Sequence, residues 1–247
     1  MEILKPLNSK LPENGIVITT FYKFAKIEEG IPLFKEKVEA FCEANLIRGT
    51  VLIAEEGING TISGPSEAIN LFYEFIKRYD ELNKITFKES YYKTHPFKKL
   101  KIRIKKEVVS SGGALCEYNP GEYVEAKDWD AFISSPDVIN IDTRNDFEFI
   151  IGTFKGAINP QTENFREFKE WCDENLKDKN QKIAGFCTGG VRCEKSTSWL
   201  KQCGYTNVYH LKGGIIGYFI ETENKNNLWQ GDCFVFDDRV IINEKLE

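Results

Sequence analysis

Histidine is scarce in this sequence of 247 residues, and closely spaced cysteine pairs are absent. The two histidines, His95 and His210, belong to no HxD, HxE or HExxH pattern, which argues against an iron site of two histidines and against a zinc protease site. The seven cysteines never form CxxC, which argues against a zinc ribbon, and their odd number does not suit a disulfide framework. No GxGxxG motif is present to indicate a flavin or nicotinamide fold. We therefore expect reduced thiols, no metal and no organic cofactor.

Long apolar runs are also missing. No stretch approaches the roughly 18 apolar residues of a membrane span, and the first ten residues, MEILKPLNSK, lack the apolar core of a signal peptide. With 41% hydrophobic and 29% charged residues, the composition is that of a globular chain. At roughly 100 to 200 residues per domain, the length indicates two domains. We expect a cytoplasmic protein that does not contact membranes.

Acidic residues are absent from residues 93–106, a segment with seven basic residues that we call the basic stripe. Since the whole chain has a net charge of −5, the remainder carries −12. Such a stripe is typical of a surface that docks a polyanion, although a charged edge strand that blocks aggregation has the same composition. Both interpretations stay open. The basic residues are Lys93, Lys98, Lys99, Lys101, Arg103, Lys105 and Lys106.

The first part of the chain alternates strand and helix patterns. Strands are predicted over 15–25, 49–53, 61–63, 85–93 and 100–109, and helices over 31–46 and 65–79. The order βαββαβ plus one strand predicts a ferredoxin-like α+β domain with its helices on one face. Residues 56–60 could contact a ligand, but we favour a hairpin turn at Asn59-Gly60.

A second pattern follows the glycine-rich exit at 110–113. Strands are predicted over 138–142, 182–186 and 207–211, helices over 164–175 and 193–203, and a turn at Gly213-Gly214. Strands that alternate with helices predict an α/β domain with a parallel sheet, whose sites form at the carboxyl ends of the strands. The predicted domains are 1–113 and 114–225, with a C-terminal tail segment at 226–247.

The most distinctive loop of the chain starts at Cys187, directly after a predicted buried strand. Gly189 and Gly190 can turn backbone N–H groups inward, and the start of the next helix adds partial positive charge. Together with the cation of Arg192, this environment is expected to lower the pKa of the Cys187 thiol and expose a reactive thiolate. The alternative, a small buried hydrophobe, is the commonest fate of a free cysteine. We favour the thiolate. The complete loop is Cys187, Thr188, Gly189, Gly190, Val191 and Arg192.

The spacing within this loop separates two thiolate chemistries. Four residues lie between Cys187 and Arg192, whereas cysteine phosphatases that the arrangement resembles use five. The shorter loop is similar to the active loop of rhodaneses, which fits a persulfide or another small adduct. Asp142-Thr143-Arg144 and the GAI at 156–158 also resemble rhodanese motifs, although Gly152-Thr153 stands where rhodaneses have Gly-His. Asp142 and Arg144 are expected to shape the loop rather than react.

Motifs in both domains resemble the rhodanese-related tRNA uridine 5-hydroxylase family. They are EGINGTISG (56–64), IDTRNDFEFIIGTFKGAINP (141–160), CTGGVRCEKS (187–196), YHLKGGI (209–215) and CFVFDDRV (233–240). The resemblance implies hydroxylation of the wobble uridine of tRNA at C5, with molecular oxygen as co-substrate and Cys187 as the catalytic residue. It also makes tRNA the partner of the basic stripe, with Lys98, Lys99, Lys101, Arg103 and Lys105 as candidate RNA contacts.

Several assignments remain open at the level of sequence. Cys193 is a candidate second thiol that could resolve an oxidised Cys187, although inward packing is favoured. Cys187 could act as a nucleophile toward C6 of uracil, or as a persulfide or sulfenic acid. His210 is expected to be a hydrogen-bonded core histidine.

The alternatives to a hydroxylase are a sulfurtransferase that uses a Cys187 persulfide and a noncatalytic RNA-binding protein. The five other cysteines, Cys42, Cys116, Cys172, Cys203 and Cys233, are expected to be structural.

Overall fold

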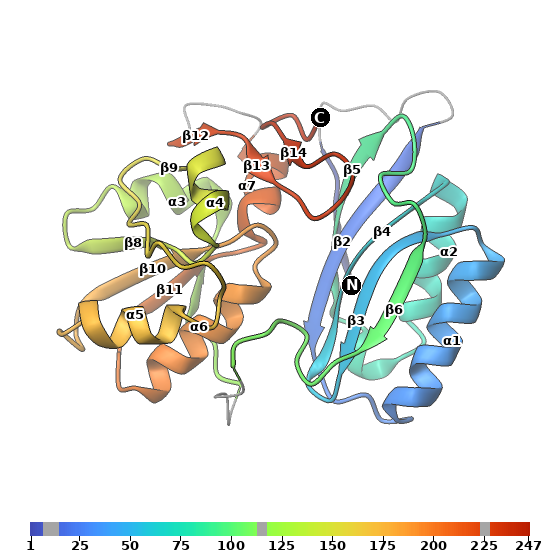
Figure 1. Ribbon diagram of the computed structural model, residues 1–247, viewed down its shortest axis with the longest axis horizontal. Helices are drawn as coiled ribbons and strands as arrows, with labels where there is room; N and C mark the ends of the chain where they lie inside the picture. Colours follow the sequence, from blue (N-terminus) through green and yellow to red (C-terminus); the bar gives the residue numbers. More distant parts are fainter. Residues whose placement is uncertain (7–14, 113–117, 223–227) are drawn as a thin grey trace. The chain divides into compact units, whose positions relative to one another are not determined.

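A computed structural model of the chain describes residues 1–6, 15–112, 118–222 and 228–247 (Figure 1). These residues form two compact units. The first unit comprises Met1–Val109, Phe236–Arg239 and Leu246–Glu247, and the second comprises Ser110–Val235 and Val240–Lys245. The C-terminal residues are therefore shared between the two units, and the Arg239 guanidinium, paired with Asp237, donates to the Ser90 hydroxyl at 3.1 Å.

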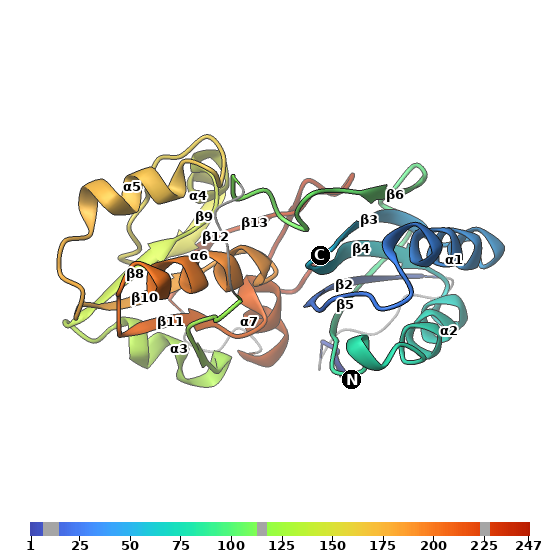
Figure 2. The ribbon, with the colours of Figure 1, turned by 90° about the horizontal axis from the view of Figure 1, so that it is seen from below.

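The first unit is built on a sheet of six strands. They are β1 (Glu2–Leu4), β2 (Ile16–Phe24), β3 (Arg48–Ala54), β4 (Gly57–Gly64), β5 (Thr86–Tyr92) and β6 (Leu100–Ile104). In the order β1-β5-β2-β4-β3-β6, the four central strands are antiparallel, and β1 and β6 add parallel at the two edges. Helices α1 (Ile31–Ala44) and α2 (Ser66–Ile76) cover one face (Figure 2), and a short 3-10 helix, η1 (Asp80–Leu82), follows α2. This arrangement confirms the ferredoxin-like prediction.

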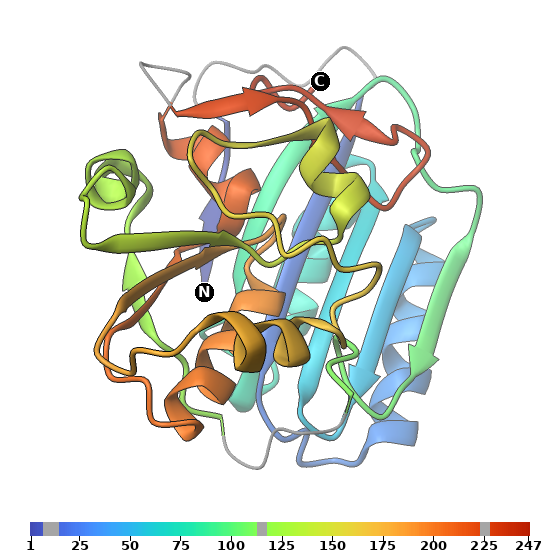
Figure 3. The same ribbon diagram turned by 60° about the vertical axis from the view of Figure 1, so that its left-hand side comes forward.

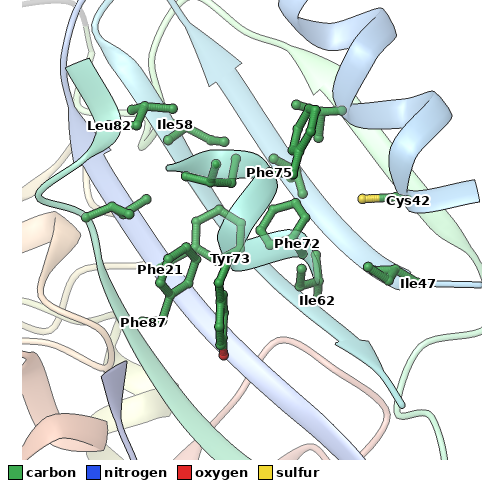
Figure 4. Close-up of a cluster of buried hydrophobic side chains, with 14 of the residues drawn as sticks. Phe21, Cys42, Ile47, Ile58, Ile62, Phe72, Tyr73, Phe75, Leu82 and Phe87 are labelled. Atoms are coloured by element: carbon green, nitrogen blue, oxygen red, sulfur yellow. The ribbon is translucent and has the colours of Figure 1, made fainter. Parts of the chain in front are cut away.

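Aromatic side chains fill the layer between this sheet and its helices (Figure 4). The ring of Phe21 on β2 lies 5.5 Å from that of Phe72 on α2 and 5.3 Å from that of Phe87 on β5. All three side chains are fully buried. Apolar residues at helical spacing on α2 and alternating residues on the strands produce this single layer.

The hairpin turn predicted at Asn59-Gly60 is wrong. Both residues lie inside β4, opposite Leu52 and Val51 of β3, and the turn is made by residues 55–56. A Cβ on Gly60 would lie 3.0 Å from the Phe21 ring, so this glycine provides room for core packing. The Asn59 amide instead donates to the backbone carbonyl of Val108 at 3.0 Å.

The second unit has a parallel sheet of four strands in the order β7-β11-β10-β8 (Figure 3). These strands are β7 (Glu122–Val124), β8 (Val138–Asp142), β10 (Lys182–Phe186) and β11 (Val208–Leu211). Five helices accompany them in the described residues: α3 (Ala126–Ile133), α4 (Asp146–Ile151), α5 (Phe168–Asn175), α6 (Val191–Gln202) and α7 (Gly214–Thr222). Figure 2 shows α3 and α7 on one side of the sheet and α5 on the other. The predicted parallel α/β domain is confirmed.

Two small antiparallel pairs complete this unit. Strand β9 (Gly152–Phe154) pairs with β12 (Trp229–Gly231), and β13 (Cys233–Phe234) pairs with β14 (Ile241–Ile242). The predicted C-terminal tail segment, residues 226–247, therefore contributes strands β12, β13 and β14 to these two pairs.

Several elements of the second unit were not predicted. The helix pattern of α7 is hidden because GIIGYFIET begins with the second of two glycines, and its residues from 214 to 220 are all buried, so no polar face marks it. Strand β7 and helices α3 and α4 are too short for a clear period. Helix α6 begins at Val191, two residues before the predicted start, which places Val191 and Arg192 in its first turn.

No helix in the described part of the chain is long and apolar enough to cross a membrane. Over the same residues, no group of three or more histidine, cysteine or acidic side chains is arranged to hold a metal ion.

Candidate active site around Cys187

Cys187 directly follows β10 and lies at the carboxyl end of the parallel sheet. Its Sγ accepts a hydrogen bond of 3.1 Å from the backbone N–H of Gly190. Gly190 caps α6 in the left-handed conformation with φ of 101°, which glycine adopts readily. The sulfur therefore lies at the N-terminus of a 12-residue helix, where backbone donors and the helix dipole favour negative charge.

The thiols of Cys193 and Cys187 influence each other's pKa. Burial raises the pKa of Cys187, but hydrogen bonds from the Cys193 thiol and backbone, the charge of Arg192 and the Gly190 N–H outweigh burial and lower the pKa to about 6. Burial and the neighbouring Cys187 raise the pKa of Cys193 well above the ordinary value. The Cys193 sulfur also lies 3.5 Å from the hydroxyl of Thr143. The opposite shifts of the two pKa values favour the negative charge on Cys187 over Cys193.

Arg192 is held by Glu148, a residue that the sequence did not single out. The Arg192 Nη1 and Nη2 donate to the two carboxylate oxygens of Glu148 at 2.6 and 2.8 Å. Nη2 of Arg192 also lies 3.3 Å from the Thr188 hydroxyl. Burial raises the pKa of Glu148, but Arg192 more than compensates, so the pKa falls below its usual range. Arg192 contributes positive charge beside Cys187 while both of its terminal nitrogens are bonded to Glu148 of α4.

A local sequence signal for Glu148 exists. Asn145 and Glu148 form a capping box at the start of α4, in which the Asn145 backbone N–H donates to the Glu148 carboxylate at 3.1 Å. The sequence NDFE directly after Asp142-Thr143-Arg144 has the N-x-x-E spacing of such a box. Recognising it would have predicted α4, but not that its glutamate reaches Arg192.

Asp142 and Arg144 form a second buried ion pair next to the loop. The Arg144 Nε and Nη2 donate to the two carboxylate oxygens of Asp142 at 2.9 and 2.7 Å, and both side chains are fully buried. Thr153 donates to the same carboxylate at 2.9 Å. The threonine that stands in place of the rhodanese histidine is thus part of this network.

The N-terminus of α7 (Gly214–Thr222) donates backbone hydrogen bonds to the Cys187 loop. The backbone N–H groups of Ile215 and Ile216 donate to the carbonyls of Cys187 and Thr188 at 3.0 and 3.1 Å. Gly214 has φ of 65°, and a Cβ there would lie 2.5 Å from the Cys187 carbonyl oxygen. The glycines predicted as a turn therefore allow a helix to approach the loop backbone closely.

Cys187 is less accessible than the sequence led us to expect. The residue is fully buried, whereas Thr188 and Gly189 above it are half-buried. The Gly190 N–H turns back toward the sulfur, and the neighbouring Cys193 is also fully buried. The Cys187 sulfur is therefore not accessible from solvent in this structure.

His210 is buried, as predicted, but it is not satisfied by hydrogen bonds. Neither ring nitrogen has a hydrogen-bond partner in the described part of the chain, and Nε2 lies 3.9 Å from a Glu194 carboxylate oxygen. Burial lowers the pKa of His210, an effect that the Glu194 charge opposes. The Tyr123 ring packs 4.4 Å from the imidazole.

The remaining cysteines differ from Cys187 in their environment. Burial is the main reason why the pKa values of Cys42, Cys172 and Cys233 rise, to about 12 for Cys42 and Cys233. Cys203 is half-buried and its pKa is also raised. Cys116 lies outside the described residues.

The basic stripe belongs to the first unit, on and around edge strand β6. All seven basic residues are exposed, and none has a carboxylate within 4.0 Å among the residues that the structure describes. Ile102 points into the core between Lys101 and Arg103, which therefore share the opposite face of β6. The stripe is thus an edge strand with unneutralised charge, and both original interpretations fit its placement.

Comparison with known proteins adds a second line of observation. Residues 16–108 match the UPF0176 acylphosphatase-like domain, and residues 125–220 match the rhodanese-like domain. The tRNA uridine(34) hydroxylase of Rickettsia canadensis (strain McKiel) is 50% identical over 234 residues, which cover 94% of each chain. Those of Rickettsia bellii (strain OSU 85-389) and of Wolbachia sp. subsp. Brugia malayi (strain TRS) are 49% and 48% identical, over 94% of this chain and over 94% and 86% of the relatives. The chain belongs to the tRNA uridine(34) hydroxylase family.

Membership in the tRNA uridine(34) hydroxylase family extends across both units, because the matched length includes the basic stripe as well as the Cys187 loop. The resemblance stated from the motifs is confirmed.

Proposed function

We propose that this protein hydroxylates uridine 34 of tRNA at C5 in the cytoplasm, with molecular oxygen as co-substrate and Cys187 as the reacting thiolate. Family membership supports the substrate and the reaction. The observation that carries the choice of residue is the Cys187 sulfur, which accepts the Gly190 N–H at the start of α6 and has a lowered pKa. Among the six cysteines that the structure describes, it is the one whose pKa is lowered.

The thiolate overcomes the low reactivity of uracil toward oxygen. Addition of the Cys187 sulfur to C6 turns C5 into an enolate-like carbon, which combines with oxygen to give a hydroperoxide at C5. After the distal oxygen of that hydroperoxide is removed, loss of the C5 proton expels the Cys187 thiolate from C6 and restores the C5–C6 double bond. The product carries one oxygen atom as a hydroxyl.

The second oxygen atom must leave as water, which takes two electrons and two protons. We assign them to Cys193 together with Cys187, because the two buried thiols interact closely enough for each to shift the pKa of the other. The Cys193 sulfur accepts the distal oxygen and becomes a sulfenic acid, and the released Cys187 thiolate then displaces water to form a Cys187–Cys193 disulfide. Uridine, oxygen and two thiols thus give 5-hydroxyuridine, water and one disulfide, which a cellular dithiol reductant resets.

The other loop residues hold this chemistry in place. Glu148 fixes Arg192, whose charge favours the thiolate, and the Asp142–Arg144 pair anchors the strand end beside it. Thr188 and Gly189 are the part of the loop that must move aside. The wobble base has to be unstacked before it reaches Cys187, at a cost of a few kcal/mol that is smallest in a single-stranded loop. The basic stripe holds the tRNA phosphates during that step.

A sulfurtransferase that uses a Cys187 persulfide is the alternative. Its usual small donors are anions, and a free arginine in the loop would attract them. Both terminal nitrogens of Arg192 are already engaged by Glu148, which favours the hydroxylase. Turnover of thiosulfate and cyanide by the purified protein, at a rate that matches its turnover of tRNA, would reverse this preference.

Nucleoside mass spectrometry tests the proposal directly. Reduced protein is mixed with unmodified tRNA in oxygenated buffer, and 5-hydroxyuridine is measured with and without a dithiol reductant. We expect no more than one 5-hydroxyuridine per protein without reductant, together with a Cys187–Cys193 disulfide in the digested protein. Absence of 5-hydroxyuridine under both conditions contradicts the reaction, whereas several turnovers without reductant contradict the role given to Cys193.

A further inference from the structure

The first unit contains a pocket of about 330 Å³ that the reaction does not use. It lies where α1 ends and where β3, α2 and β6 begin. We call it the Leu46 pocket. Leu46, Ile47 and Pro65 give it apolar walls, and Arg48, His95 and Lys99 bring basic side chains.

Leu46 occupies a backbone position at which glycine is usual. Helix α1 ends in a Schellman motif, in which the Leu46 N–H bonds to the Glu43 carbonyl at 3.2 Å and the Ile47 N–H bonds to the Cys42 carbonyl at 2.9 Å. Leu46 is the left-handed residue of the motif, with φ of 56°, and its side chain is 75% exposed. A bulky residue in this conformation is strained, and strain of this kind concentrates at functional positions. The chain thus presents a leucine to solvent at the rim of a pocket, in a conformation that disfavours it.

The basic side chains of the pocket form no ion pair with the acidic residues that the structure describes, Glu43 in the pocket wall included. Arg48 and Lys99 are exposed, and no carboxylate lies within 4.0 Å of either in the residues that the structure describes. His95 Nδ1 lies 3.0 Å from the Ser63 hydroxyl. Burial and the nearby Arg48 charge lower the pKa of His95. The unneutralised charge of Arg48 and Lys99 suits phosphate groups.

The pocket is continuous with the basic stripe. Lys99 belongs to both, and Leu100 at the pocket wall is the first residue of β6. A polyanion that follows the exposed side chains of Lys101 and Arg103 along β6 reaches the pocket mouth at Lys99. Proteins that hold single-stranded nucleic acid combine a basic track with a surface on which a base packs; the surface is usually aromatic, and here it is the apolar recess beside the basic stripe.

We propose that the Leu46 pocket binds one unstacked nucleotide of the tRNA, different from the uridine that reacts. The base packs against the exposed Leu46 and Pro65, and Arg48 and Lys99 hold the phosphates on either side of it. Glu43, also in the pocket wall, provides a carboxylate that accepts hydrogen bonds from an exocyclic amino group. The pocket therefore prefers cytosine, adenine or guanine to uracil, which has no amino group. This inference rests on the proposed function only for the identity of the RNA.

Two variants of the full-length protein, each with a matched control, test the pocket. Leu46→Gly removes the side chain and relieves the strained backbone, and its control is Leu33→Ala, an exposed leucine 46% accessible on α1. Arg48→Gln removes a charge, and its control is the exposed Arg78→Gln. The probe is unmodified transcript tRNA with uridine 34, with its Kd measured over a range of salt concentrations. Hydroxylation of the same tRNA is measured separately.

We expect Leu46→Gly to raise the Kd about fivefold, near the lower end of what loss of a stacked base costs, because a leucine offers less surface than an aromatic ring, while its melting temperature does not fall. Arg48→Gln should weaken binding and reduce the salt dependence by about one unit of slope. In nuclear magnetic resonance titrations, CMP, AMP and GMP should shift the amide signals of residues 46–48 at lower concentration than UMP. Glu43→Gln should remove that preference.

The outcomes separate this inference from the proposed function. An unchanged Kd for Leu46→Gly, or shifts that are equal for UMP and the other nucleotides, overturns the inference even if the tRNA is hydroxylated. Binding as expected without any hydroxylation leaves the pocket in place and overturns the proposed reaction instead.

Discussion

Arg192 and Glu148 meet across 44 residues of sequence in a bidentate pair with donor–acceptor distances of 2.6 and 2.8 Å. The carboxylate is fully buried, and the arginine side chain is 8% exposed. Such a pair fixes the direction of the guanidinium, so Arg192 acts on the nearby thiolate through its charge while α4 determines its position. The Gly190 N–H and the fixed charge of Arg192 therefore give the Cys187 loop an environment that stabilises one small negative group.

Replacing the reactive sulfur should stop the reaction. Cys187→Ser is expected to reduce 5-hydroxyuridine formation at least about a thousandfold, because a hydroxyl is almost entirely protonated at neutral pH and is a weak nucleophile. Nucleoside mass spectrometry measures the product, and circular dichroism checks the fold. Cys203→Ser, at a half-buried thiol outside the loop, is the control and should keep full activity. Near-normal product from Cys187→Ser excludes Cys187 as the catalytic residue.

Breaking the Glu148 pair should affect both stability and the thiolate. Glu148→Ala leaves Arg192 as an uncompensated buried charge, which typically costs about 3–5 kcal/mol of unfolding free energy. In the milder variant Glu148→Gln, the unneutralised Arg192 should lower the pKa of Cys187 further. Urea unfolding and thiolate absorbance at 240 nm measure the two effects, with the exposed Glu174→Gln as control. A higher Cys187 pKa in Glu148→Gln would refute the electrostatic role of Arg192.

The ionisation of Cys187 should make stability depend on pH. Its pKa is lowered in the folded protein from about 9 to about 6, so between these values the folded chain holds a thiolate and the unfolded chain a thiol. The resulting stabilisation is complete above pH 9 and is lost as pH falls toward 6. The difference in unfolding free energy between the wild type and Cys187→Ser should therefore grow from pH 6 to pH 9. A difference that is constant over this range means that the thiol is protonated in the folded protein.

The basic stripe should carry a measurable share of tRNA affinity. Changing Lys99, Lys101 and Lys105 together to glutamine should weaken binding and lower the salt dependence by about one unit of slope for each lost phosphate contact. The control changes the exposed Lys26, Lys77 and Lys84 of the same unit. If both triple variants bind equally well and with equal slope, the stripe serves only to protect the edge of the sheet.

A single methyl group at Gly214 should disturb the loop from below. Gly214→Ala places a Cβ 2.5 Å from the Cys187 carbonyl oxygen and 2.6 Å from the Gly190 nitrogen, in a backbone conformation that alanine disfavours. We expect loss of most hydroxylation and destabilisation of about 1–3 kcal/mol. Gly156→Ala is the control, since φ is also positive there but nothing lies within 4 Å. Equal activity of the two variants contradicts the support that α7 is inferred to give the loop.

Local sequence patterns were enough to predict the order of the main strands and helices and the position of the Cys187 loop. Alternating and helical periods fixed the βαββαβ order of the first unit and the parallel strands of the second, because burial on one face or on both leaves a readable period. The position of Cys187 after a strand and before two glycines also predicted its role as a helix-capped thiol. These features depend on residues that are close together in the sequence, so the sequence alone is enough to predict them.

Only the tertiary structure decided which distant groups meet. Asn59-Gly60 reads as a turn, but Gly60 is needed where the Phe21 ring crosses β4, a contact between residues that are far apart in sequence. The turn predicted at Gly213-Gly214 includes Gly213, but Gly214 begins α7 and lets this helix touch the Cys187 loop. Glu148 gave no sign of its partner Arg192, and the Cys193 thiol lies beside Cys187 because α6 starts at Val191. Close approach and charge pairing are properties of position in space, which local periodicity does not encode.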